Sequence, residues 1–204
     1  MRPIPIPYEK FGESSFRSRE MKEAFDVLER ALILHRARPS VSTQIPIVEK
    51  LRKAPKLFFL DVGLVNYRIG FKEFFSGQSL DNVYQGKISE QVAAQEIMAQ
   101  EFERPALRFW IRERGAAEID FLYPFNDSII PIEVKSGKTG KLKSLHLFME
   151  SSHHPYALRV YSGKTRVDQV KLPSGKTYYL CSIPYYLLSR LNDVMESFVS
   201  EHKL

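Results

Sequence analysis

The sequence predicts an α+β (α/β) fold in which several helices and strands follow one another along the chain. Three observations lead to this expectation. Apolar residues recur at helical spacing in several segments, short apolar runs bounded by turn residues mark strands between them, and the 204 residues are 44% hydrophobic and 26% charged, as in globular domains. The length allows one domain of ordinary size or two small ones.

The N-terminal part predicts a small winged-helix-like module. Met21, Phe25, Leu28 and Leu32 share one face of a helix expected over residues 18–34. Residues 33–38 are compatible with a strand, and residues 40–54, which contain Pro46, with a hairpin or loop. An apolar run over 56–60 predicts a buried strand, followed by a turn at 61–63. We therefore place a first module over residues 1–75 and a second domain over 76–204.

The second domain is expected to alternate helices and strands after a connecting segment over residues 70–85. Its helices have apolar positions at helical spacing, and its strands are short apolar runs. In order, the elements are a helix over 87–102, strands over 107–113, 117–123 and 129–136, a helix over 141–151, strands over 156–162 and 177–183, and a helix over 185–199.

Positive charge is concentrated in one segment. The chain has a net charge of +6, and residues 135–176 alone carry seven Lys and two Arg against two acids, a local balance of +7. A solvated basic face is one reading of this segment. A footprint for the phosphates of DNA is the other, with Lys138, Lys141 and Lys143 as the expected contacts.

A candidate site lies in a predicted β-hairpin whose turn is centred on Asn126-Asp127, residues that favour hairpin turns. With this centre, Asp120 lies opposite Glu133 and Glu118 opposite Lys135. All four side chains then share one face, and Ile119, Phe121, Ile132 and Val134 take the other. Directly opposed carboxylates repel each other unless a cation lies between them.

A hard divalent ion suits such a carboxylate pair. Mg²⁺ takes one or two protein carboxylates and keeps waters and substrate phosphates as its other ligands. Lys135, next to Glu133 on the same face, can stabilise developing negative charge, as in metal-assisted phosphodiester hydrolysis. The alternative is an exposed mixed-charge hairpin in which Glu118 and Lys135 pair and the acids are merely solvated.

Two features favour a site over a solvated face. Glu133 follows the hydrophobic run 129–132, which is typical of a central strand. Glu90 lies on the apolar face of the upstream helix with Ala93, Ala94 and Ile97. An acid on such a face needs a partner, although a surface Glu whose carboxylate reaches solvent is the alternative.

These residues resemble the PD-(D/E)xK nuclease superfamily, with a helical Glu90, a strand Asp120 and the sequence Glu133-Val134-Lys135. Together with Phe109-Trp110 and the Lys-Leu-Phe-Phe-Leu-Asp-Val-Gly-Leu sequence at 56–64, they resemble more closely an uncharacterised domain at the C-terminus of prokaryotic AAA-type ATPases. The resemblance covers most of the chain.

The resemblance implies a restriction-endonuclease-like core, in which a mixed sheet is flanked by helices. It also implies that Glu90, Asp120 and Glu133 surround Mg²⁺, or Mn²⁺ in its place, with Lys135 beside them. Related members can lose acids and serve only as binding domains. The function expected from it is Mg²⁺-dependent hydrolysis of DNA phosphodiesters. The alternative is a non-catalytic module that binds DNA or protein for an AAA-type ATPase.

An ATP site is not expected in this chain. Ser-Gly-Lys-Thr occurs three times, but a phosphate loop also needs a glycine five residues before the second glycine. Ile132, Leu158 and Val170 occupy those positions. Cys181 is the single cysteine, no apolar run approaches the roughly 18 residues of a membrane span, and the N-terminus lacks a signal peptide's apolar core. We therefore expect a cytoplasmic protein without a membrane partner.

Overall fold

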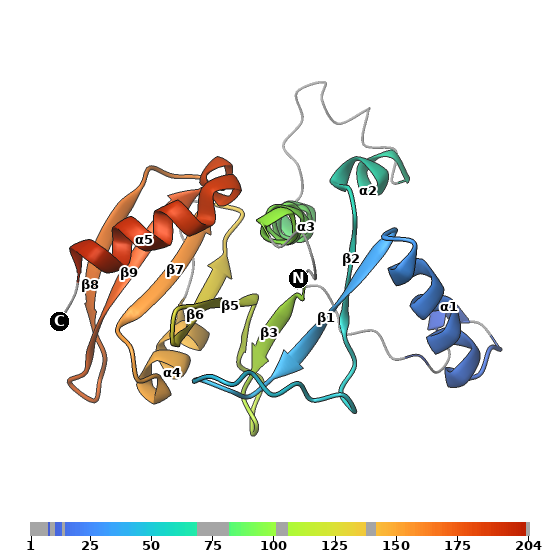
Figure 1. The fold of residues 1–204 in the computed structure, drawn as a ribbon, viewed down its shortest axis with the longest axis horizontal. Helices are drawn as coiled ribbons and strands as arrows, with labels where there is room; N and C mark the ends of the chain where they lie inside the picture. The colour runs from blue at the N-terminus through green and yellow to red at the C-terminus, as the bar shows by residue number, and fades with distance from the viewer. Residues whose placement is uncertain are drawn as a thin grey trace.

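The computed structural model describes residues 8, 11–13, 15–68, 82–100, 106–137 and 142–202. In these ranges two β-sheets lie side by side and helices cover them (Figure 1). This confirms the predicted α+β class with mixed sheets flanked by helices. None of the helices in these ranges combines the length and apolar character that crossing a bilayer requires.

The first sheet has the strand order β2-β1-β3-β4, with β1 antiparallel to β2 and parallel to β3. Its strands are β1 (Leu34–Ser40), β2 (Lys56–Phe59), β3 (Arg108–Ile111) and β4 (Glu118–Ile119). Two of these strands precede residue 75 and two follow it, so this sheet joins both parts of the chain. The division after residue 75 and the winged-helix-like module stay predictions.

The second sheet has the strand order β5-β6-β7-β9-β8. Its strands are β5 (Phe121–Phe125), β6 (Ser128–Val134), β7 (Tyr156–Tyr161), β8 (Arg166–Lys171) and β9 (Thr177–Pro184). The three central strands are parallel, and each edge strand is antiparallel to its neighbour. As predicted for the segment containing Glu133, β6 is a central strand with a partner on both sides.

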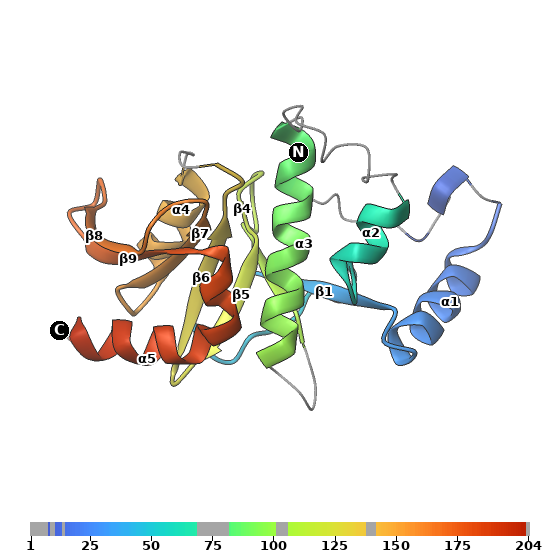
Figure 2. The ribbon, with the colours of Figure 1, turned by 90° about the horizontal axis from the view of Figure 1, so that it is seen from above.

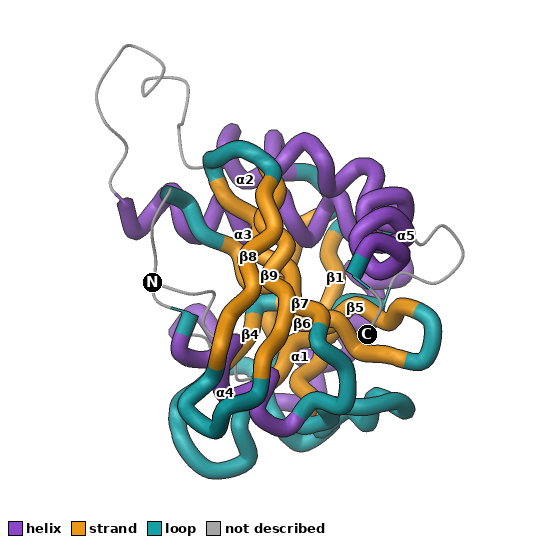
Figure 3. Tube along the Cα trace, turned by 90° about the vertical axis from the view of Figure 1, so that its left-hand side faces the viewer, coloured by secondary structure: helices purple, strands orange, loops and turns teal. Residues whose placement is uncertain are grey.

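Helices cover both faces of the second sheet, with α3 and α5 on one side and α4 on the other (Figures 2 and 3). The described α-helices are α1 (Ser18–Arg30), α2 (Val62–Arg68), α3 (Asn82–Gln100), α4 (Lys143–Ser151) and α5 (Leu191–Glu201). A 3₁₀ helix, η3 (Tyr185–Arg190), leads into α5, so the helix expected over 185–199 has two parts. Another 3₁₀ turn is formed by Phe11–Glu13.

Two hydrophobic cores fill the spaces between these layers. The first core lies between the second sheet and α3 and α5, and it includes Ile132 and Val134 of β6. The second core lies between the other face and α4, and it includes Ile129 and Phe148. Both faces of β6 are therefore buried, as expected for a central strand.

The predicted hairpin register is confirmed for β5 and β6, where Phe121 pairs with Ile132 and Phe125 with Ser128. The register does not continue through Asp120. Here the chain bends and passes from β4 in the first sheet to β5 in the second. Asp120 is thus the single residue between the two sheets.

This bend corrects two predictions. Glu118 does not lie opposite Lys135, because β4 pairs with β3 and the strand partner of Glu118 is Ile111. Ile119 belongs to the second core and Phe121 to the first, so they do not share a face. One irregular residue between two strands shifts the alternation of side chains, which a continuous strand would have kept.

The N-terminal helix is shorter than predicted. It ends at Arg30, because Leu32 adopts the left-handed backbone conformation (φ 57°), which a helix cannot continue through. Leu32 is exposed rather than part of the buried face. The residues beyond it form β1 instead.

Three further elements differ from the expected ones. The helix α2 replaces the turn expected at 61–63, and α3 begins at Asn82, inside the segment expected to be connecting. The edge strand β8 was not predicted. It is a mostly exposed and polar strand, so it has no apolar run by which it could be recognised.

The hairpin turn allows a backbone test. Asn126 has φ 52°, whereas its exposed neighbour Asp127 is not in the left-handed region. We expect Asn126→Val to lower the free energy of unfolding by about 1–2 kcal/mol more than Asp127→Val does, because a β-branched residue tolerates positive φ poorly. Urea unfolding of the two variants measures this, and equal losses would contradict the turn geometry.

Candidate functional site

A buried lysine that the sequence analysis did not single out lies at the centre of a cluster of acids. The Lys56 side chain is fully buried, and its Nζ is 2.7 Å from Oε1 of Glu118 and 3.5 Å from Oε2 of Glu90. The ammonium also lies over the Phe109 ring, 4.8 Å from its centroid. The three charged side chains come from β2, β4 and α3, so one cation joins three elements.

Strand alternation turns Lys56 inward. In β2 the buried positions are Lys56 and Phe58, and Phe58 is part of the first core. Because residues two apart share a face of a strand, Lys56 must point into the same interior. The signal available in the sequence was a lysine two residues before a core phenylalanine in a predicted strand. A lysine at such a position is buried and requires an anion to pair with it.

The charges in this cluster shift one another's protonation. Burial acts to lower the pKa of Lys56, but Glu90, Asp120 and Glu118 outweigh it and raise this pKa, so the lysine is charged. Burial, together with the nearby charges of Asp120 and Glu118, raises the pKa of Glu90 to about 8 against the opposing effect of Lys56. One ammonium facing three carboxyl groups thus leaves Glu90 protonated at neutral pH.

Asp120 connects this cluster to β6. Its Oδ2 accepts a hydrogen bond of 2.8 Å from the backbone N–H of Val134. Its Oδ1 is buried and has no hydrogen-bond partner among the described residues. Since Asp120 is only 2% exposed, this oxygen lies in an interior that favours a cationic or hydrogen-bonding partner for it.

Glu133 and Lys135 are on either side of Val134. Lys135 Nζ is 2.5 Å from Oε1 of Glu133, which is almost fully buried, and the Lys135 side chain is 19% exposed. The backbone carbonyl of Lys135 accepts a hydrogen bond of 2.5 Å from the hydroxyl of Tyr185 in η3. These contacts fix the end of β6 where the predicted acid and lysine lie.

The predicted site residues therefore form two neighbouring groups rather than one ring. Glu90 joins Lys56 on the α3 side, and strand alternation turns Glu133 away from the face of Ile132 and Val134. Asp120, bonded to β6 and electrostatically coupled to Glu90, lies between the two groups. Within the described ranges, no three Asp, Glu, His or Cys side chains are grouped as a metal site.

The donor chemistry of these residues fits a hard cation. Carboxylate oxygens are the ligands that Mg²⁺ prefers, and it commonly takes only one or two of them from a protein. Asp120 offers such an oxygen in Oδ1. Burial of Glu90, Asp120 and Glu133 rules out the two alternatives of a solvated hairpin face and a surface Glu90.

A basic cavity lies next to the exposed edge of this region. Its volume is about 270 Å³, and Arg112, Lys143 and Ser144 contribute to its lining. The Ser144 hydroxyl accepts a hydrogen bond of 3.4 Å from the backbone N–H of Glu118, whose side chain is 16% exposed. Lys143, one of the three predicted contacts to DNA, is exposed at the start of α4, and Lys138 and Lys141 lie outside the described residues.

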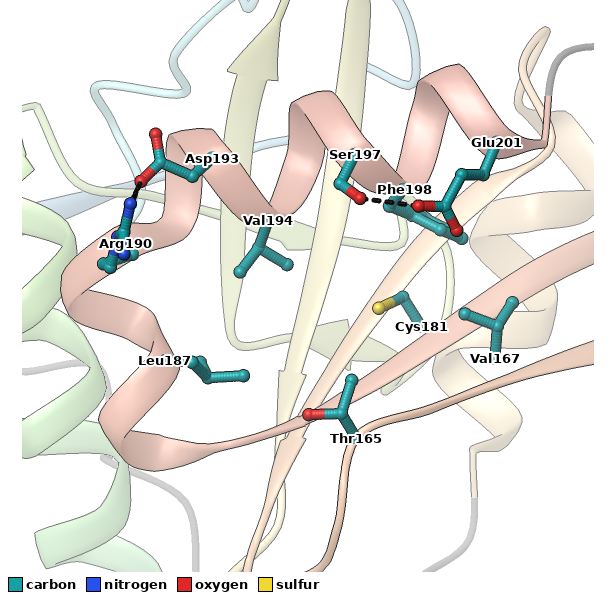
Figure 4. Close-up of a pocket in the computed structure, with 10 residues that line it drawn as sticks. All are labelled: Thr165, Val167, Cys181, Leu187, Arg190, Asp193, Val194, Ser197, Phe198 and Glu201. Carbon is teal, nitrogen blue, oxygen red and sulfur yellow. Dashed lines mark hydrogen bonds and ion pairs between the residues drawn. The ribbon is translucent and has the colours of Figure 1, made fainter.

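A second cavity, of about 400 Å³, lies away from the acids between α5 and strands β8 and β9 (Figure 4). The Cys181 thiol and the side chains of Val194 and Phe198 contribute to its wall. Burial raises the pKa of Cys181 to about 11, so the thiol is protonated at neutral pH. A protonated thiol is a poor nucleophile, and this cavity is not a candidate for covalent chemistry.

Removing the Lys56 charge is expected to destabilise the fold. Lys56→Met should lower the free energy of unfolding by about 3–5 kcal/mol, because it leaves the buried acids Glu90 and Glu118 without their cation. The triple variant with Glu90→Gln and Glu118→Gln should recover part of this loss. Lys53→Met, at an exposed position, should change stability by less than about 0.5 kcal/mol. Denaturant unfolding compares them, and a neutral Lys56→Met would rule out the buried pair.

The raised pKa of Glu90 predicts a pH dependence. An unfolded Glu ionises near pH 4.5, whereas folded Glu90 keeps its proton up to about pH 8. The folded state therefore binds more protons in this window, and its stability should fall by up to about 1.4 kcal/mol per pH unit as the pH rises. Glu90→Gln should remove this slope and Glu96→Gln, on the same helix, should keep it. Parallel slopes for wild type and Glu90→Gln would contradict the assignment.

Comparison with known families adds two matches. The domain of unknown function DUF8612 matches residues 7–74, and the domain of unknown function DUF4143 matches residues 85–186, half of the chain. No curated protein and no solved structure matches the chain. DUF4143 is found in proteins associated with AAA-type ATPases, which agrees with the predicted resemblance to an uncharacterised domain. The chain belongs to the DUF4143 family.

Proposed function

We propose that this chain is a Mg²⁺-dependent nuclease-like domain that hydrolyses DNA phosphodiesters. The observation that supports it most is the hydrogen bond from Val134 N–H to Asp120. It holds the Asp120 carboxylate at the backbone of Val134, the residue between Glu133 and Lys135, so one acid from the bend after β4 lies at the end of β6 that carries the other acid and the lysine. This is the residue set of the PD-(D/E)xK resemblance.

Each residue has a role in this proposal. Asp120 and Glu133 would hold Mg²⁺, or Mn²⁺ in its place, and Glu90 would complete or orient the ligand shell. The ion supplies Lewis-acid stabilisation and a lowered pKa of bound water when it is present. Lys135, partly exposed and bonded to Glu133, would orient the attacking water and stabilise negative charge on the phosphate.

The DNA strand would approach along the basic cavity. Arg112 and Lys143 place positive charge beside Glu118, at the edge where the acid cluster reaches the surface. Lys138 and Lys141 belong to the same basic segment and would add backbone contacts. Because DUF4143 occurs in ATPase-associated proteins, we propose an AAA-type ATPase, in the same polypeptide or as a partner, as the source of ATP-driven work.

Burial favours a second candidate, a non-catalytic module that binds DNA or protein for such an ATPase. Asp120 and Glu133 are only 2% and 1% exposed, and Lys56 already provides a cation to the neighbouring acids. An acid cluster balanced in this way can serve stability alone. The two candidates differ in whether the acids bind a divalent ion.

Cleavage of supercoiled plasmid and branched DNA with Mg²⁺ or Mn²⁺ tests the proposal. Asp120→Asn and Lys135→Ala should each reduce cleavage by at least about 100-fold, because they remove a metal ligand and a charge-stabilising group. Asp127→Asn is the matched control, since it removes an exposed acid from the turn of the same hairpin. It should cleave as wild type does.

Metal-dependent cleavage that persists in both site variants would rule out this site. Titration calorimetry with Mn²⁺ separates the two candidates. A nuclease-like site should bind the ion and lose it on Asp120→Asn. A chain that binds DNA in a salt-dependent manner, but neither binds the ion nor cuts, is a binding module.

A further inference from the structure

A row of polar side chains crosses the second sheet beside the proposed site. In the strand register, Glu133 of β6 lies opposite Arg159 of β7, and Arg159 lies opposite Ser182 of β9. Residues paired in this way point to the same face of a sheet. All three are near the carboxyl ends of the parallel strands, where open α/β sheets bind their ligands.

The same face of the sheet is covered by α4 nearer the amino ends of these strands. Ala157 and Leu180, which precede Arg159 and Ser182 by two residues, pack in the second core with Phe148 of α4. On this face of the sheet, the polar side chains of Arg159 and Ser182 therefore begin where the second core ends. The interior position of Arg159 and Ser182 follows from the strands themselves and not from an exposed loop.

Arg159 is a buried cation with unused donors. It is 7% exposed, and its Nε and one terminal nitrogen, Nη2, are buried without a hydrogen-bond partner among the described residues. Its guanidinium lies over the Tyr161 ring, 4.6 Å from the centroid. The Tyr161 hydroxyl donates a hydrogen bond of 2.6 Å to the backbone carbonyl of Lys164, which holds this ring in place under Arg159.

Two buried hydroxyls lie on this face of β9, that of Ser182 towards the carboxyl end and that of Tyr178 at the amino end. The Ser182 Oγ and the Tyr178 hydroxyl are both buried without a hydrogen-bond partner in the described part of the chain. Glu133, the acid next in the row, is bonded through Oε1 to Lys135.

We propose that Arg159 and Ser182 form a recessed subsite for a phosphate group. A guanidinium presents a planar fork of donors that matches phosphate oxygens, and charge-assisted bonds of this kind are the strong ones. The hydroxyl of Ser182, which lies opposite Arg159 on the neighbouring strand, adds a further donor to a set suited to a tetrahedral oxyanion. A terminal phosphate of a DNA strand and free phosphate share this chemistry, and the choice of DNA rests on the proposed function.

The stability of the phosphate-free protein distinguishes a phosphate subsite from a purely structural role of Arg159. Buried donors without acceptors cost free energy, so replacing this guanidinium by an apolar side chain of similar length should not destabilise the phosphate-free protein. Arg159→Met should therefore have a Tm in phosphate-free buffer at or above that of wild type. A residue kept only for its packing and charge would lose stability on the same change.

The test measures binding in the presence of a chelator, so that no metal and no cleavage enter it. Inorganic phosphate should raise the Tm of wild type by about 3 °C or more at saturation and leave Arg159→Met unchanged. A 5′-phosphorylated oligonucleotide should bind wild type at least about tenfold more tightly than its 5′-hydroxyl counterpart. Arg159→Met should abolish this difference.

Arg190→Met is the matched control, because it removes an exposed arginine next to α5, on the other side of the sheet. It should behave as wild type in both assays. Ser182→Ala, which should weaken the response to phosphate, keeps the test decisive if Arg159→Met does not fold. A phosphate-induced rise in Tm with equal binding of the two oligonucleotides would assign the subsite to free phosphate.

The proposal is overturned if phosphate leaves the wild-type Tm unchanged and the two oligonucleotides bind equally. It is also overturned if Arg159→Met keeps the wild-type responses. Failure of the cleavage experiment would leave these results intact, and loss of the phosphate response would leave metal-dependent cleavage by Asp120 and Lys135 intact. The two proposals therefore fail separately.

Discussion

The contact between the Lys56 ammonium and the carboxyl groups of Glu118 and Glu90 is the constraint on which the arrangement of the site depends. It joins β2, β4 and α3, elements that are distant in sequence, at one fully buried cation. A buried charge is tolerated only when its partners are complete. Strand β2 therefore has to pack where its lysine reaches Glu118 on β4 and Glu90 on α3.

Placing β4 in this way places Asp120. The chain leaves the first sheet at Ile119 and enters the second at Phe121, so the orientation of the residue between them is set by both sheets at once. The hydrogen bond from Val134 then fixes one carboxylate oxygen and leaves the other directed elsewhere. A position that breaks strand alternation and buries an acid violates two local rules, and such violations are expected at functional sites.

Much of the fold was accessible from the sequence because it depends on local patterns. The turn at Asn126-Asp127 fixed the register of β5 and β6, and the apolar run before Glu133 indicated a central strand. The bend at Asp120 was not accessible, because it results from β4 pairing with β3 and not from any local residue preference. The burial of Lys56 could have been inferred from its phase with Phe58, but its partners could not, since Glu90 and Glu118 are brought to it only by tertiary packing.

The balance of charge around Lys56 also links stability to the proposed chemistry. One ammonium cannot neutralise Glu90, Glu118 and Asp120 together, and the shortfall is met by the raised pKa of Glu90. A proton on Glu90 and additional positive charge near Asp120 are therefore alternative ways to satisfy the same carboxyl groups. Since a metal ion requires deprotonated ligands, binding an ion at Asp120 would favour release of the Glu90 proton. The same buried charges that join the first sheet to α3 would then set the pH at which the site accepts a cation.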